Sequence, residues 1–132
     1  MVDFRLVMSK TDGKSFQKQI KGAEAEELLK KRIGDKISGT ALGLSGYEFE
    51  IMGGSDTCGF PMRKGIQQPR KVVFIGKSVG FCGKDRNGKK QPGLTKRKTV
   101  CGEVISKSIV QVNLKVLKEG AEPLVHEPAE KK

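Results

Sequence analysis

The sequence predicts a mainly β protein: a small β-barrel-like domain of about six to seven short strands, with one short α-helix over residues 23–33 and a long basic loop. Three observations predict this class. Apolar residues recur at every second position in several short segments, a pattern typical of half-buried strands, and one segment alone has the helical period. Glycine supplies 17 of the 132 residues, about twice its usual share. Short strands separated by Gly-rich turns are typical of small barrels.

The chain is expected to open with a β-hairpin. Every second residue from Val2 to Met8 is apolar, which predicts a strand with one buried face. Asp12 and Gly13 follow as a favoured turn pair, and residues 15–20 have the pattern of the returning strand. Two antiparallel strands therefore begin the sheet.

Residues 23–33 form the one segment with helical spacing. Its apolar side chains fall on one face of a helix; they are Ala25, Leu28, Leu29 and Ile33. Acidic residues lie near its start and basic residues near its end, which complements the helix dipole, and Gly34 is placed to end it. We expect this helix to pack on a sheet.

Short apolar pieces separated by glycines follow the helix and predict the remaining strands. They cover residues 36–40, 47–52, 71–77 and 100–105. Residues 110–116 alternate most regularly, so this strand is expected to lie at the centre of the sheet. We expect one domain over residues 1–118 and a mostly extended tail over residues 119–132.

The net charge of +11 belongs to one part of the chain. Residues 63–98, here called the basic segment, contain twelve cations against one acid, Asp85, while the remainder holds 14 cations and 14 anions. A field of one sign repels itself unless an anionic partner lies on it. The candidate RNA-binding residues are Arg63, Lys64, Arg70, Lys71, Lys84, Arg86, Lys89, Lys90, Lys96, Arg97 and Lys98.

Charge alone leaves DNA, RNA and a membrane surface open as partners. Residues 80–93 have no apolar period and are expected to form a long loop, and long loops in compact domains are usually functional or disordered. Cations on irregular loops, instead of on an amphipathic helix, disfavour the membrane surface. The longest stretch without charge, residues 37–47, is shorter than the about 20 apolar residues that cross a bilayer.

No catalytic, cofactor or metal site is expected, nor a small-molecule substrate. The single histidine, His126, lies in the Pro-flanked tail, and the three cysteines contain no Cys-x-x-Cys pair. Residues 76–78 (Gly-Lys-Ser) lack the glycine that a phosphate-binding loop needs five residues earlier. An odd cysteine count suits a reducing, intracellular setting. We expect Cys82 and Cys101 to be structural thiols and Cys58 to lie exposed in a loop.

A Gly-rich segment between residues 53 and 62 precedes the basic segment. It is interpreted as a turn in which Asp56 bonds to local backbone amides, as at a tight corner of a barrel. Its glycines would also let backbone amides approach phosphates closely. In that case Phe60, Pro61 and Met62 would wedge against a base or sugar. The two interpretations are compatible.

The string Ile-Met-Gly-Gly-x-Asp-x-x-Gly-x-Pro-Met resembles the signature of a ribosomal family, small-subunit protein six of the archaeal and eukaryotic type, which is unrelated to the bacterial protein of that number. The signature residues are Gly53, Gly54, Asp56, Gly59, Phe60, Pro61 and Met62. The resemblance continues through residues 96–105 and the N-terminal hairpin, and it covers about residues 1–118.

This resemblance implies a β-barrel-like structural constituent of the small ribosomal subunit, bound to ribosomal RNA and neighbouring ribosomal proteins in the cytoplasm. It implies neither catalytic activity nor a cofactor. Eukaryotic relatives carry a long basic C-terminal extension, and this sequence stops at Lys132, so an archaeal source is expected. The choice of ribosomal RNA among polyanions depends on the resemblance. Composition alone also allows a non-ribosomal RNA-binding module or a translation-associated factor.

Overall fold

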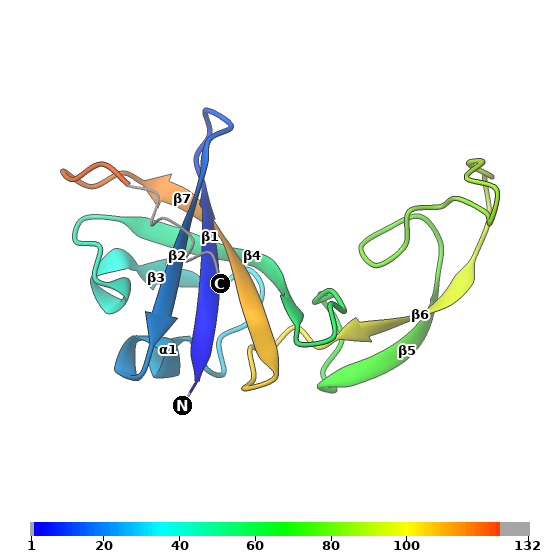
Figure 1. Cartoon of the computed structure of the whole chain (residues 1–132), viewed down its shortest axis with the longest axis horizontal. Helices are drawn as coiled ribbons and strands as arrows, with labels where there is room; N and C mark the ends of the chain where they lie inside the picture. Colours follow the sequence, from blue (N-terminus) through cyan, green and yellow to red (C-terminus); the bar gives the residue numbers. More distant parts are fainter. Residues whose placement is uncertain (1, 125–132) are drawn as a thin grey trace, which may run out of the picture.

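A computed structural model of the chain describes residues 2–124. Within that range it is mainly β, as predicted, with seven strands, one α-helix and one short 3-10 helix. Five strands form one sheet, in the order β2-β1-β7-β4-β3, and two form a separate ribbon (Figure 1). The sheet contains β1 (Asp3–Ser9), β2 (Ser15–Lys21), β3 (Lys36–Ser38), β4 (Glu48–Asp56) and β7 (Ile109–Lys118). The ribbon contains β5 (Arg70–Ile75) and β6 (Lys96–Cys101).

The predicted hairpin and the predicted central strand are both confirmed. Strands β1 and β2 pair antiparallel from Asp3 opposite Lys21 to Ser9 opposite Ser15. Strand β7 lies third of the five, parallel to β1 and antiparallel to β4. The alternating residues face the core, whose fully buried side chains include Phe4, Leu6, Met8, Phe49, Ile51, Val112 and Leu114.

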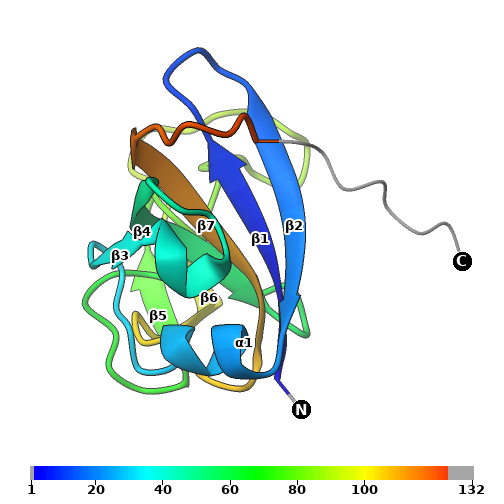
Figure 2. The same ribbon diagram turned by 90° about the vertical axis from the view of Figure 1, so that its left-hand side faces the viewer.

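The barrel-like sheet stays open, because the edge strands β2 and β3 do not pair with each other. Strand β3 has only three residues, since the chain turns directly into the 3-10 helix η1 (Gly39–Leu42). The helix α1 (Ala23–Leu28) contacts β2 and η1, and η1 contacts β3 (Figure 2). Lys18 of β2 donates a 2.9 Å hydrogen bond to the Leu42 carbonyl. The helical segments α1 and η1 therefore lie between the two edge strands, β2 and β3, in place of strand pairing.

The helix begins at the predicted residue, Ala23, but ends at Leu28 and not at Ile33. Residues 30–34 find backbone partners outside the helix: the amides of Lys30 and Ile33 donate to the carbonyls of Ile105 and Glu103. These bonds replace the hydrogen bonds along the helix that residues 29–33 would otherwise make. The periodicity was still informative, because Leu29 and Ile33 pack against the core.

Two more boundaries differ from the prediction. The expected strand over residues 100–105 is β6, Lys96–Cys101, so the cations at 96–98 stand on a strand. The first residues of the Gly-rich segment, 53–56, continue strand β4 and do not form a turn. Their pairing with β7 and with residues 60–62 explains this extension, because both edges of the strand find partners. The turn itself is confined to residues 57–59.

The chain after β7 returns to the sheet. Gly120 lies close to the Tyr47 ring, the Tyr47 hydroxyl donates to the Glu122 carbonyl, and Leu124 is buried in the core. The rest of the expected tail, including His126, lies outside the described residues. No helix within residues 2–124 is long and apolar enough to cross a bilayer.

Candidate nucleic-acid interface

Most of the basic segment lies on one projecting part of the molecule. Residues 70–101, here called the arm, comprise the β5-β6 ribbon and the loop that joins its strands, and Figure 1 shows the arm extending away from the five-stranded sheet. Apart from Arg70, which pairs with Asp56, the exposed cations of the basic segment are Lys64, Lys71, Lys77, Lys84, Arg86, Lys89, Lys90, Arg97 and Lys98. Within residues 2–124 none of these nine forms an ion pair. They are therefore available to neutralise a polyanion.

The single acid of the basic segment organises the end of the arm. The Oδ1 atom of Asp85 accepts hydrogen bonds from the backbone amides of Asn87 and Lys89, each 2.9 Å long, and Oδ2 accepts one from the Gln91 side chain at 3.0 Å. A bridge pairs Lys84 with Lys90 at the base of this turn. Asp85 thus fixes the backbone that carries the loop cations, defined here as Lys84, Arg86, Lys89 and Lys90.

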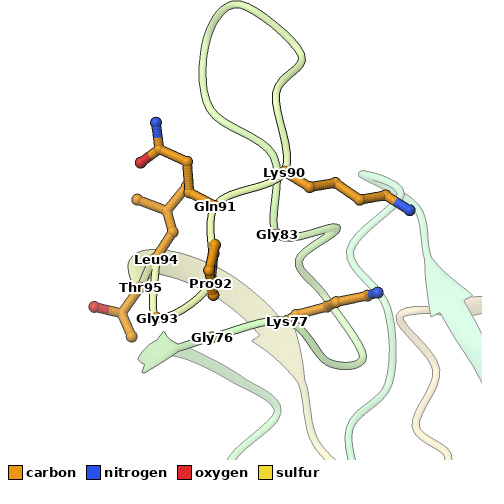
Figure 3. A pocket seen from close by; sticks show the side chains of 9 residues that line it. All are labelled: Gly76, Lys77, Gly83, Lys90, Gln91, Pro92, Gly93, Leu94 and Thr95. Atoms are coloured by element: carbon orange, nitrogen blue, oxygen red, sulfur yellow. The ribbon is translucent and has the colours of Figure 1, made fainter.

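A hollow of about 350 Å³ lies beside this loop. Three glycines, Gly76, Gly83 and Gly93, contribute to its wall. Gly93 is exposed and a Cβ on it would meet nothing within 4 Å, whereas Gly83 is buried against the Lys77 side chain. In Figure 3 the side chains of Lys77 and Lys90, which also line the hollow, extend in the same direction. Two lysine side chains on the same side of an exposed loop suit a phosphate group of a nucleic acid.

Two of the predicted RNA-binding arginines are engaged inside the molecule. Arg63 donates from one guanidinium nitrogen to the Ser78 hydroxyl at 2.8 Å and to the Val79 carbonyl at 2.9 Å, and so holds the start of the loop. Arg70 donates from Nε and from a terminal nitrogen to Oδ2 of Asp56, at 3.0 and 2.6 Å. The geometry gives both arginines a role in positioning the arm.

Asp56 joins the Gly-rich segment to the arm. Its side chain is only 1% exposed, and Oδ1 accepts from the backbone amides of Cys58 and Phe60 at 2.9 Å. The Cys101 thiol donates to Oδ2 at 3.1 Å. Burial by itself raises the pKa of Asp56. The hydrogen bonds from Cys101, the Phe60 amide, Arg70 and the Cys58 amide outweigh burial and lower this pKa from 3.8 to about 2.

The pKa values of the two side-chain partners of Asp56 are raised. The hydrogen bond to Asp56 raises the pKa of Arg70 above its ordinary value. Burial, followed by the hydrogen bond to Asp56, raises the pKa of the Cys101 thiol from 9.0 to about 11. At neutral pH the cluster is therefore a carboxylate, a guanidinium cation and a neutral thiol.

The structure does not support the predicted wedge of Phe60, Pro61 and Met62, because the side chains of Phe60 and Met62 pack inward. Met62 is 3% exposed and belongs to the core, and Phe60 packs against the core with the Arg70 guanidinium 5.1 Å from its ring centroid. Gly54 is required by backbone contact, since a Cβ there would lie 2.2 Å from the Gln111 carbonyl oxygen of β7. The segment is a junction between the sheet and the arm.

Comparison with known proteins identifies the family. The chain is 45% identical to the small ribosomal subunit protein eS6 of Archaeoglobus fulgidus over 93% of both chains. It is 40% identical to the protein of that name from Methanococcus maripaludis over 95% of both chains. Its identity to the Thermoplasma acidophilum protein is 37%, over 85% of this chain and 86% of the relative. The sequence model of the family "Ribosomal protein S6e" matches residues 4–127. The chain belongs to this family.

Membership in the S6e family confirms the resemblance that the Gly-rich signature indicated. The S6e family is one of ribosomal proteins, so the expectation of a structural protein and not an enzyme is also confirmed. The relatives named above are archaeal, in keeping with the expected source. Among residues 2–124, no three His, Cys, Asp or Glu side chains gather as metal ligands.

The predicted environment is confirmed for two of the three cysteines of this S6e chain. Cys58 is exposed and Cys101 is buried, as expected, whereas Cys82 is exposed and has no structural role in a core. Its neighbour Phe81 is the residue that packs against the ribbon, with the amines of Lys96 and Lys98 at 6.0 and 5.6 Å from its ring centroid. The loop has no alternating pattern from which the burial of Phe81 and the exposure of Cys82 could be predicted.

Sequence reasoning missed the exposed apolar residues of the arm. Val72 is 58% exposed and Phe74 is 69% exposed, although both lie within strand β5. The available signal was the run of four apolar residues from Val72 to Ile75, because such a run places two apolar side chains on each face of a strand. A ribbon covered on one face only must leave the other pair exposed.

Proposed function

We propose that this chain is a structural constituent of the small ribosomal subunit that binds ribosomal RNA through its arm. Family membership and the small-subunit names of the relatives support the ribosomal assignment. The observation that carries the RNA contact is the separation of charge, because the whole net charge of +11 resides in residues 63–98 and the remainder is neutral. The five-stranded sheet is then a rigid platform, with neighbouring ribosomal proteins as its further partners.

The roles of the cations follow from their positions. The loop cations lie at the far end of the arm and reach between RNA helices, where the wide A-form minor groove and the 2′-hydroxyls allow recognition by shape. Lys64, Lys71, Lys96, Arg97 and Lys98 neutralise phosphates along the ribbon and its base. Arg63 and Arg70 hold the arm to the sheet.

Reversing the loop cations tests this function. In the variant with Lys84, Arg86, Lys89 and Lys90 all changed to Glu, we expect much weaker binding to small-subunit ribosomal RNA. The slope of log affinity against log salt should fall in magnitude by at least about 3, because four phosphate contacts are lost. A filter-binding titration at several salt concentrations measures both quantities.

A second variant separates specific placement from total charge. Lys14, Lys21, Lys36 and Lys107 are exposed cations outside the basic segment, and changing all four to Glu alters the net charge by the same amount. This control should retain most of the wild-type affinity and salt slope. Equal losses in the two variants, or unchanged binding in the loop variant, would contradict the proposed function.

A further inference from the structure

The β5-β6 ribbon has one covered face and one open face. Ile75 and Val100 point to the covered face, and both lie within 3.3 Å of where a Cβ on Gly80 would stand. Phe81 packs on this same face, beneath the amines of Lys96 and Lys98. The loop therefore folds back over one side of its own ribbon and leaves Val72 and Phe74 on the other side exposed.

The open face presents an aromatic ring beside a cation. Phe74, with 69% of its surface exposed, lies directly opposite Arg97 in the strand register, and Val72 lies opposite Thr99. Directly opposite residues on a ribbon have side chains close together on one face. The remaining pair on this face, Arg70 opposite Cys101, is already bonded to Asp56, so Arg97 is the cation that the open face offers.

We propose that the open face of the ribbon holds an unpaired nucleotide of ribosomal RNA, with its base stacked on Phe74 and its phosphate against Arg97. This inference rests on the proposed function, and it adds that the arm recognises single-stranded RNA as well as helix backbone. Aromatic side chains on a cationic surface are the usual platform for unpaired bases. Bases within an A-form helix are stacked and paired, so a side chain on a ribbon does not reach their faces.

The charge around Phe74 favours RNA over a protein partner. Phe74 and Val72 are the two apolar residues of the open face, which is less apolar surface than the core of a protein interface usually has. Their surroundings belong to a segment with twelve cations and one acid, and that acid, Asp85, is occupied by the loop. An anionic ligand with a flat apolar face fits these features, and a nucleotide has both.

A tryptophan reporter tests the stacking directly. The sequence contains no Trp, so Phe74→Trp introduces a single one on the open face. Titration with a short single-stranded oligoadenylate should quench its fluorescence, while a blunt RNA duplex of equal length should bind with little quenching. Absence of quenching at saturating single strand would overturn the proposal.

Affinity measurements with two further variants complete the test. Phe74→Ala should weaken binding of the single strand roughly five- to hundred-fold, with the salt slope unchanged because no phosphate contact is lost. Phe74→Leu should behave as Phe74→Ala does, since stacking needs the ring. Met52→Ala is the matched control, because Met52 is 52% exposed on β4, outside the arm, and should leave binding unchanged.

The possible outcomes separate this inference from the proposed function. If Phe74→Ala binds as the wild type does while reversal of the loop cations weakens binding, the stacking site is wrong and the RNA-binding role stands. If Phe74→Leu restores full affinity, or if Phe74→Ala keeps its RNA affinity but fails to enter subunits, the face contacts an apolar or protein partner and the inference fails. If the loop variant binds RNA unchanged, the proposed function itself fails.

Discussion

Asp56 is the buried charged side chain among residues 2–124, and it connects the two parts of the molecule. Its oxygen atoms accept hydrogen bonds from the backbone amides of Cys58 and Phe60 and from Arg70 and Cys101 at the base of the arm. A buried carboxylate is costly unless its partners satisfy it, and here they do. Asp56 therefore holds the Gly-rich segment and the base of the arm together.

We predict that Asp56→Asn lowers the free energy of unfolding by about 1.5–3 kcal/mol at pH 7, because hydrogen bonds to a charged acceptor are lost. The folded-state pKa of about 2 lies below the unfolded value of 3.8. Asp56 therefore stabilises the fold above about pH 4, and this contribution is lost as the pH falls from about 4 to about 2. The difference between wild type and variant should shrink over that range.

Urea unfolding between pH 2 and pH 7 measures this difference. Asp35→Asn is a suitable control, since Asp35 is exposed and its side chain accepts one backbone hydrogen bond, from Arg32. That variant should change the stability by less than about 1 kcal/mol at every pH. A constant difference between wild type and Asp56→Asn down to pH 2 would show that the carboxylate is not the stabilising form.

The backbone contacts of Asp56 could be predicted from the sequence, and its side-chain contacts could not. An aspartate next to a Gly-rich turn was expected to bond to local amides, and the Cys58 and Phe60 amides confirm it. The pairing with Arg70 could not be predicted, because a count of charges treats all cations of the basic segment alike. Which arginine binds internally depends on how the arm leaves the sheet, and that is a property of the tertiary fold.

At the scale of elements, strand β4 changes partners along its length. It pairs with β3 over residues 48–50, and with residues 60–62 over residues 54–56, while β7 runs along its other edge. Register shifts interrupt its pairing with β7, one of them between Ile51 and Gly53. Bulges of this kind bend a strand, and this strand leads from the sheet to the arm.

Two neighbouring glycines in β4 give a matched test of this packing. A Cβ on Gly54 would lie 2.2 Å from a backbone oxygen of β7, whereas a Cβ on Gly53 meets nothing within 4 Å. Gly54→Ala should therefore destabilise the fold by about 1–3 kcal/mol or more. Gly53→Ala should change stability by less than about 1 kcal/mol. Thermal melts of the two variants check this, and equal melting temperatures would contradict the pairing of β4 with β7.

Elements with strong periodicity were predicted well, and elements set by tertiary contacts were not. The hairpin and β7 were predictable because their alternating residues each face one core. The helix ended early because Lys30, Lys31 and Ile33 bond to the backbone of Glu103 and Ile105, which lie some seventy residues further along the chain. The sheet stays open for a similar reason, since the three-residue β3 is followed by η1, and β3 contacts η1 while α1 contacts β2 and η1.

At the scale of the whole molecule, charge and fold are separated. A nearly neutral five-stranded sheet carries the core, and the arm carries unpaired cations on a ribbon that extends away from it (Figure 1). The concentration of positive charge in residues 63–98 could be predicted, because the charged residues can be counted directly in the sequence. Its projection on an arm could not, because it depends on β5 and β6 forming a two-stranded sheet separate from the other five strands.

The central claim, that the arm anchors this chain in the small ribosomal subunit, is tested most directly by sedimentation. Lysates of cells that express the wild type or the loop variant would be run through high-salt sucrose gradients, and the chain quantified in the small-subunit fraction. We predict close to one wild-type copy per small subunit, and almost none of the variant with Lys84, Arg86, Lys89 and Lys90 changed to Glu. A wild-type chain that is substoichiometric and removed by salt, or a loop variant that sediments normally with the subunit, would contradict the claim.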